Sequence, residues 1–136
     1  MDKPVLLQDK TPDGVSIKIG VHTAEYNSSV PYKSGFRWGA ELKEPRIIVT
    51  RINVEFGNTK VFVPLSAYCD LTNPNICTLQ TSNKSFVLVI EGGQASTSYK
   101  AEIYFENGYI KKRKVSHQEF PDESWEETVY SFNYLF

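Results

Sequence analysis

The chain has 136 residues, of which 40% are hydrophobic and 13% aromatic, and its formal net charge is −1. This composition excludes a disordered chain and suits one globular domain, residues 1–136, with a core of its own. The near-neutral charge provides no general attraction for nucleic acid, and no apolar run has the length of a membrane-spanning helix. We therefore expect neither nucleic-acid binding nor membrane insertion.

The first part of the chain predicts two short strands separated by a long loop. Residues 15–21 alternate weakly after the turn at residues 12–14, and they predict the first strand. Residues 22–35 are polar and predict a loop. Every second residue from Phe36 to Leu42 is apolar, which predicts the second strand.

The longest predicted strand covers residues 46–56, with Ile48, Ile52, Val54 and Phe56 on its core face. The pair Gly57-Asn58 predicts a tight turn into residues 60–63, so these two strands form a hairpin. After Pro64, we expect residues 65–71 to continue the strand around a bend. Residues 72–84 are expected to be mostly loop.

The second half of the chain carries the clearest strand patterns. Residues 86–91 form an almost continuous apolar run, which is typical of a central strand covered on both faces. Alternation over residues 99–105 predicts that every second side chain, starting with Tyr99, points inward. Asn107-Gly108 then predicts a type I′ turn, which requires positive φ at both residues, into a strand over residues 109–115.

The last residues also alternate. Residues 121–126 are expected to form one helical turn, and residues 128–136 to form a final strand with an aromatic face. This short stretch resembles the terminal strand of outer-membrane β-barrels. Both faces of residues 111–114 carry charge, however, and a lipid-facing Lys or Arg would cost about 2–4 kcal/mol at the bilayer midplane. The charge opposes insertion into a membrane.

These elements predict an all-β protein, a single-domain antiparallel β-sandwich of about eight strands. A small β-barrel is the alternative. Local patterns do not distinguish one sheet that closes on itself from two sheets that stack.

Cys69 and Cys77 flank a turn-rich segment and are a candidate disulfide, which would stabilise the fold by about 2–3 kcal/mol. The alternative is two free cysteines, one per strand edge, that act as small buried apolar residues. A disulfide would place the protein in an oxidising compartment, periplasmic or secreted, whereas free thiols fit the cytoplasm. The first residues lack the basic and apolar regions of a signal peptide.

Residues suited to catalysis or metal binding are few and scattered. His22 and His117 are the only histidines, and with the two cysteines they lack the spacing of a zinc site, so we expect no metal and no cofactor. Cys69, Asp70 and His117 offer the residue types of a nucleophile, an orienting acid and a base, but their spacing does not indicate such a set. We assign no catalytic residue and favour a protein that is not an enzyme.

A basic run, residues 111–114, is followed closely by an acidic segment. A patch for phosphate or for an acidic partner is one interpretation of the run. Alternation splits its four side chains between two faces, so we favour an edge strand protected by lysines and partly neutralised by the acidic segment. The acidic residues are Glu119, Asp122, Glu123, Glu126 and Glu127.

The leading hypothesis is a non-enzymatic binding protein that recognises another protein through loops on a rigid β scaffold. The partner would be a toxin neutralised by an immunity-type module, or a component of the cell envelope. The candidate loops are residues 26–36, 68–77 and 92–99. Aromatic residues are enriched at interface hot spots, and the candidate exposed anchors in these loops are Tyr26, Tyr32, Tyr68 and Tyr99.

Two other functions fit the same pattern. A small-ligand carrier or hydrolase would need a pocket of roughly 300–1,000 Å³ in the β-fold, with His117, Glu119 and Cys69 as the residues to test. An assembly subunit would pair through an open edge strand.

Overall fold

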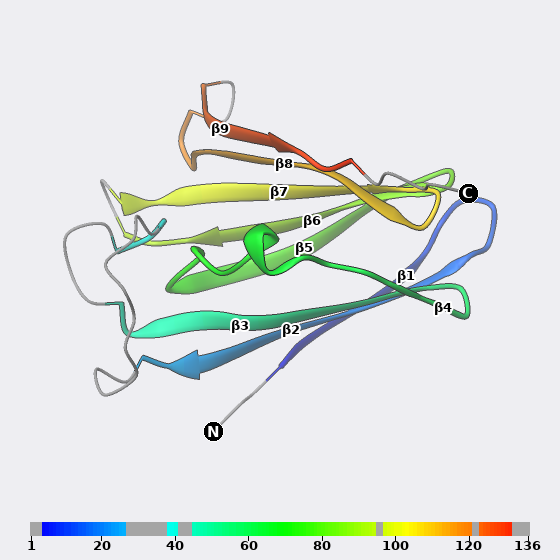
Figure 1. The fold of residues 1–136 in the computed structure, drawn as a ribbon, viewed down its shortest axis with the longest axis horizontal. Coiled ribbons are helices and arrows are strands. Elements are labelled where there is room, and N and C mark those ends of the chain that lie inside the picture. The colour runs from blue at the N-terminus through cyan, green and yellow to red at the C-terminus, as the bar shows by residue number, and fades with distance from the viewer. Residues whose placement is uncertain (1–3, 27–37, 41–44, 95–96, 121–122, 132–136) are drawn as a thin grey trace.

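The computed structural model describes residues 4–26, 38–40, 45–94, 97–120 and 123–131. These residues form two antiparallel β-sheets stacked face to face (Figure 1). The predicted all-β sandwich is confirmed. The alternative of a barrel is wrong, because neither sheet closes on itself within the described residues.

The four-stranded sheet has the order β1-β2-β3-β4 and is the lower layer in Figure 1. Its strands are β1 (Val5–Lys10), β2 (Ser16–Glu25), β3 (Ile47–Phe56) and β4 (Thr59–Val61). The predicted hairpin at Gly57-Asn58 joins β3 to β4. The sequence pattern did not indicate β1, because all its side chains except the half-buried Leu7 are exposed and alternation is therefore lost.

The five-stranded sheet has the order β5-β6-β7-β8-β9. Its strands are β5 (Pro74–Ser82), β6 (Ser85–Gly92), β7 (Tyr99–Glu106), β8 (Tyr109–His117) and β9 (Ser124–Val129). Every second side chain of β7 is buried from Tyr99 onward, as predicted. Asn107 and Gly108 have φ values of 52° and 84°, as the predicted type I′ turn requires.

Four local predictions are wrong. Residues 72–84 are not mostly loop, because polar β5 gains a complete pairing partner in β6. β9 already begins at Ser124, so residues 124–126 are extended rather than helical. Residues 65–67 form a 3-10 helix, η1 (Leu65–Ala67), instead of a bent strand. The second predicted strand is also not formed over residues 38–40: Trp38 makes one isolated bridge, to Leu71, and Gly39 and Ala40 form a turn. The rest of that strand lies outside the described residues, as do residues 132–136 of the predicted final strand.

Two β-bulges decide which side chains reach the core. In β3, Thr50 is an extra residue opposite the step from His22 to Thr23, so Val49 is buried in place of the predicted Ile48. In β8, Lys111 is the extra residue opposite the step from Tyr104 to Phe105. The second bulge lets Ile110 and Arg113, three residues apart, both face the interior.

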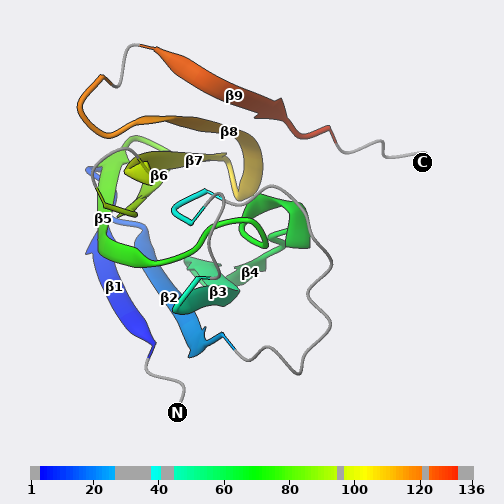
Figure 2. The same ribbon diagram turned by 90° about the vertical axis from the view of Figure 1, so that its left-hand side faces the viewer.

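Packed side chains fill the space between the sheets. The rings of Phe86 and Phe105 stack with centroids 4.7 Å apart, and Phe56 stacks on Phe86 at 5.8 Å. β1 runs beside β5 at one lateral side of the sandwich, and η1 lies at the other (Figure 2). The interior is therefore a core rather than a ligand cavity.

Tyr99 is a buried structural residue. Its side chain is 0% exposed and its hydroxyl donates a hydrogen bond of 2.8 Å to the carbonyl oxygen of Thr72. Burial raises the pKa of Tyr99 far above its ordinary value. Gly39 and Gly92 press against the ring, and a Cβ at either position would lie 2.8 Å from ring atom Cε1.

We expect Tyr99→Phe to lower the free energy of unfolding by about 1–3 kcal/mol, because the buried carbonyl of Thr72 loses its donor. Tyr104→Phe is the matched control: its hydroxyl donates to Glu102 on the half-exposed outer face, so its loss should cost much less. Urea denaturation of both variants checks this. Equal losses would contradict the structural role of the Tyr99 hydroxyl.

Candidate functional site

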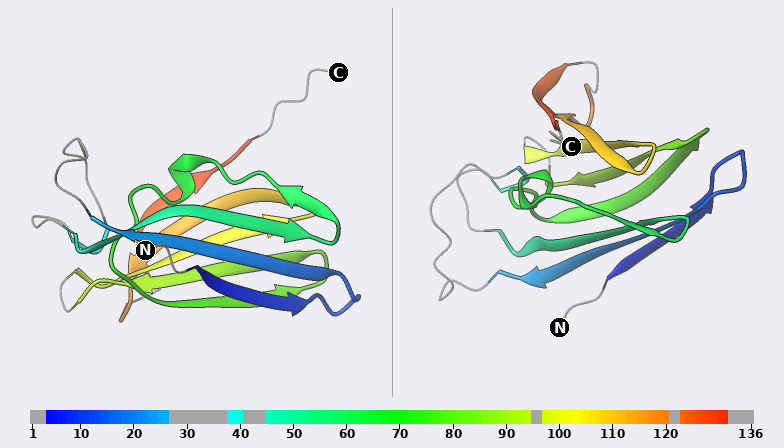
Figure 3. Two further views of the ribbon diagram at one scale, coloured as in Figure 1. Left: turned by 90° about the horizontal axis from the view of Figure 1, so that it is seen from below. Right: turned by 45° about the vertical axis from the view of Figure 1, so that its right-hand side comes forward.

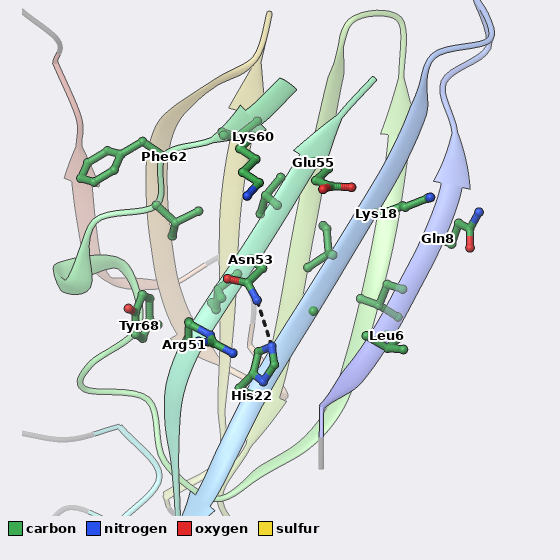
Figure 4. Close-up of a pocket in the computed structure, with 17 residues that line it drawn as sticks. Leu6, Gln8, Lys18, His22, Arg51, Asn53, Glu55, Lys60, Phe62 and Tyr68 are labelled. Atoms are coloured by element: carbon green, nitrogen blue, oxygen red, sulfur yellow. Dashed lines mark hydrogen bonds between the residues drawn. The ribbon is translucent and has the colours of Figure 1, made fainter. Parts of the chain in front are cut away.

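An open groove of about 710 Å³ crosses the outer face of the four-stranded sheet (Figure 4). Figure 3 (left) shows this sheet from below. Leu6 and Gln8 of β1 stand at one side of the groove, and Phe62 and Tyr68 of the segment after β4 stand at the other. The groove floor is therefore rigid paired strand, and its two sides are apolar.

Gly20 lies at the centre of the groove floor. The register places Gly20 between Leu6 on β1 and Asn53 on β3, in one row across the sheet. Gly20 is buried, and a Cβ at this position would lie 3.4 Å from Nε2 of His22 and 3.6 Å from Cδ2 of Leu6, which is ordinary contact. The absence of a side chain therefore lets Leu6 and His22 lie close over the strand.

His22 and Asn53 form the polar part of the floor. Nδ2 of Asn53 lies 3.0 Å from Nε2 of His22, so this ring nitrogen accepts the hydrogen bond in the assigned orientation of the amide. The Thr50 hydroxyl donates to the carbonyl oxygen of His22 at the bulge. The bulge keeps Arg51 on the outer face, opposite His22.

The next row of the groove is charged. Lys18, Glu55 and Lys60 are neighbours on β2, β3 and β4. With Arg51, the groove carries three cations and one carboxylate, a formal net charge of +2 on a chain whose net charge is −1. Within the described part of the chain, no ion pair engages these four exposed side chains.

The outer face of the five-stranded sheet is arranged differently. Lys114 lies between Glu102 and Glu127 on neighbouring strands, and Lys100 lies opposite Glu91. Lys112 places its ammonium 4.8 Å from the ring centroid of Tyr104. Opposite charges face each other on both sheets, because Glu55 likewise lies between Lys18 and Lys60, and the two faces differ in that the groove has an excess of positive charge.

A buried arginine holds the segment that forms one side of the groove. Arg113 is 3% exposed and donates to both carboxylate oxygens of Asp70, at 2.6 and 2.9 Å. It also donates to both oxygens of Glu126 and to the carbonyl oxygens of Ser66 and Ala67. Burial lowers the pKa of Arg113, but the hydrogen bonds to Asp70 and Glu126 raise it by more than burial lowers it. The net pKa is raised, so Arg113 stays charged.

This arginine changes the interpretation of the basic run. β8 pairs with β7 and β9, so the run is not on an edge strand as predicted. The predicted neutralisation by the acidic segment occurs at Arg113, which binds Glu126. Simple alternation placed Lys111 and Arg113 on one face, and the bulge at Lys111 separates them.

The four predicted tyrosine anchors have different environments. Tyr99 is buried beneath the loops, and Tyr68 is 8% exposed with part of its surface on the groove, so the expectation of exposed anchors is wrong for both. Tyr26 is half-buried just after β2. Tyr32 lies outside the described residues. Whether any of the four binds a partner stays a prediction.

The hydrolase residues do not assemble into a catalytic set. Arg113 occupies both carboxylate oxygens of Asp70. The backbone N–H of Glu119 donates to Nδ1 of His117, and Ser98 Oγ lies 3.4 Å from Nε2. Both ring nitrogens of His117 therefore have partners other than Cys69. Among the described residues, no three of His, Cys, Asp and Glu are grouped to hold a metal ion.

The candidate disulfide is not formed, because Cys69 and Cys77 are both free. Burial and the neighbouring Asp70 raise the pKa of the Cys69 thiol. Burial raises the pKa of Cys77 to about 11. Neither cysteine has the low pKa of a nucleophile. The expected burial is wrong for Cys69, which is exposed, and Cys77 is half-buried.

An aromatic cluster lies at one end of the sandwich and was not predicted. Trp38 and Trp125 stack with centroids 5.3 Å apart and an interplanar angle of 7°. His117 meets Trp125 edge-on and contacts Phe120. A third bulge, at Trp125, causes this arrangement, and a helical interpretation of residues 121–126 hid it.

Comparison with known proteins adds no relative. No protein-family model matches this chain, and neither a curated protein nor a solved structure matches it. The described residues also contain no helix long and apolar enough to cross a membrane. The groove is therefore interpreted from its own geometry.

Sequence reasoning identified part of the groove. It placed residues 15–21, which include Lys18 and Gly20, in a strand, but it assigned neither residue to a binding site. It did not find β1, and so it missed Leu6 and Gln8. The available signal was a glycine inside an alternating strand, which marks close approach of another group.

We expect Arg113→Met to lower the free energy of unfolding by about 3 kcal/mol, because Asp70 and Glu126 lose their shared cation. The two carboxylates are about one-quarter exposed, which places the loss at the lower end for a buried pair. Lys111→Met, on the exposed bulge residue next to this site, should change stability by less than about 0.5 kcal/mol. Chemical denaturation measures both. We call these contacts of Arg113 with Asp70, Ser66, Ala67 and Glu126 the clasp. An Arg113→Met protein as stable as wild type would contradict its structural role.

We expect thiol titration of the unfolded, unreduced chain to find both cysteines free. In the folded protein, the alkylation rate of Cys77 should keep rising until the pH reaches about 11, because only the thiolate reacts. Mass spectrometry after iodoacetamide labelling at a series of pH values measures this. Recovery of a Cys69–Cys77 linked peptide would show instead that the disulfide forms.

Proposed function

We propose that this chain is a non-enzymatic binding protein that recognises another protein through the groove on its four-stranded sheet. One observation carries the proposal: a groove of about 710 Å³ over paired strands, with polar strand residues on its floor and the exposed apolar side chains of Leu6 and Phe62 at its sides. The described candidate catalytic residues make structural contacts instead, which favours binding over catalysis.

The sides of the groove supply apolar contact area. Leu6 is 77% exposed and Phe62 is 68% exposed. Burying such side chains in a complex contributes about 25 cal/mol per Å² of apolar surface, before the costs of association. The polar floor between them provides hydrogen-bonding groups that select one partner over another.

Rigid strands hold the groove, so little order has to be gained on binding. β2 is paired on both sides, with β1 and β3, and the clasp at Arg113 holds the segment that carries Tyr68. Preorganisation of this kind lowers the entropy cost of association. The partner classes we propose are a toxin that the protein neutralises and a component of the cell envelope. Contacts through the loops at residues 26–36, 68–77 and 92–99 stay a prediction, and residues 27–36, 95 and 96 of these loops lie outside the described residues.

A small-ligand carrier is the second candidate. The groove volume of about 710 Å³ falls in the range of small-molecule sites, and His22, Asn53 and Arg51 meet at one place on its floor. The groove is open along an outer sheet face, however, whereas most small-ligand sites enclose their ligand. This difference favours a protein partner.

We expect Gly20→Val to weaken partner binding about tenfold or more, because the valine side chain would push Leu6 and His22 away from their positions on the groove floor. Gly20 lacks a positive φ and lies in a strand, so the backbone accepts valine. Thr78→Val is the control, on an exposed residue of β5 outside the groove.

The measurement is capture of stoichiometric partners from a lysate of the source organism by wild type and by both variants, followed by determination of Kd. Melting temperatures verify that each variant is folded. A partner retained equally by all three proteins would contradict binding in the groove. Loss of a small molecule rather than of a protein with Gly20→Val would favour the second candidate.

A further inference from the structure

We infer that the groove takes an acidic polypeptide segment, with carboxylates over Lys18, Lys60 and Arg51 and apolar side chains against Leu6 and Phe62. This inference rests on the proposed function and names the chemistry of the partner. It is carried by the positive charge of the groove, +2 on a chain of net charge −1, and by the placement of that charge between two apolar sides.

The cations of the groove are available to a partner. Lys18, Arg51 and Lys60 are exposed, and within the described residues none of them forms an ion pair. Lys18 and Lys60 flank one carboxylate, Glu55, so this row and Arg51 together keep an excess of positive charge. An anionic segment in the groove would gain close charge contacts, which are stronger where water is excluded.

The spacing of the lysines suits an extended peptide. Lys18 and Lys60 are on β2 and β4, two strand spacings apart, which is about 9.6 Å. Three residues of extended chain cover about the same length. Acidic residues separated by one or two positions can therefore reach both lysines, while their neighbours face the apolar sides.

The same row argues against nucleic acid. Glu55 lies between Lys18 and Lys60, so the positive track is interrupted at its centre. A phosphodiester backbone carries charge at every nucleotide and would be repelled there. A peptide can place an apolar or amide side chain over Glu55. The mixed chemistry of the groove therefore favours protein over nucleic acid.

The test uses a fluorescein-labelled peptide of glutamates, leucines and serines, and a control peptide in which each glutamate is glutamine. The full chain is compared with the double variant Lys18→Glu/Lys60→Glu and with a matched double variant, Lys84→Glu/Lys111→Glu. All four lysines are exposed, and both double variants change the net charge equally. Fluorescence anisotropy at low and high salt measures Kd, and amide chemical shifts of labelled protein locate the peptide.

We expect the glutamate peptide to bind about tenfold or more tightly than the glutamine peptide, with shifts on β2, β3 and β4. The Lys18→Glu/Lys60→Glu variant should lose about tenfold in affinity and most of the salt dependence, and the matched variant less than about twofold. Equal binding of the two peptides, shifts outside the groove, or tighter binding of an oligonucleotide of equal charge would overturn the inference.

Failure of the inference and failure of the proposed function can be told apart. If Gly20→Val abolishes binding of the natural partner but Lys18→Glu/Lys60→Glu does not change it, the groove binds protein and the acidic chemistry is wrong. If Gly20→Val leaves that partner bound, the proposed function itself is wrong. Loss of binding with both variants, and retention with Lys84→Glu/Lys111→Glu, supports both.

Discussion

The clasp of Arg113 is the interaction on which the open side of the sandwich depends. Two stacked sheets have two lateral sides, and β1 beside β5 covers one of them. On the other side, the guanidinium joins β8 to the η1 segment through Asp70, Ser66 and Ala67, and to β9 through Glu126. A planar group with five N–H donors suits this task, because it can bind two carboxylates and two carbonyls at once.

Local irregularity makes both the clasp and the groove. The bulge at Lys111 turns Arg113 inward while Ile110 also stays in the core, and the bulge at Thr50 keeps Arg51 outside while Val49 is buried. Bulges re-aim side chains without changing the rest of a strand. Gly20, which has no side chain, lets Leu6 and His22 lie close over the centre of the groove floor. The candidate binding surface thus combines regular strand pairing with two local irregularities, the bulge at Thr50 and the glycine at position 20.

The two outer faces suggest different roles. On the five-stranded sheet, neighbouring strands bring opposite charges together, as with Lys114 between Glu102 and Glu127, and such a face is well suited to water. The groove face has an excess of positive charge beside exposed Leu6 and Phe62. An excess of one charge beside exposed apolar surface is typical of a binding face, because a partner can supply the opposite charge and cover the apolar side chains.

The amino-acid sequence alone determined the all-β class, the hairpins at Gly57-Asn58 and Asn107-Gly108, and the buried face of β7, because turn chemistry and alternation are local properties. Only the tertiary structure decided which strands pair and what lies across the sheet. β1 and β5 have weak sequence patterns of their own and become strands by pairing with their neighbours. The bulge at Lys111, which turns Arg113 inward, depends on the partner strand β7. The groove joins β1 to the segment after β4, which are far apart in the chain, so no local pattern could show it.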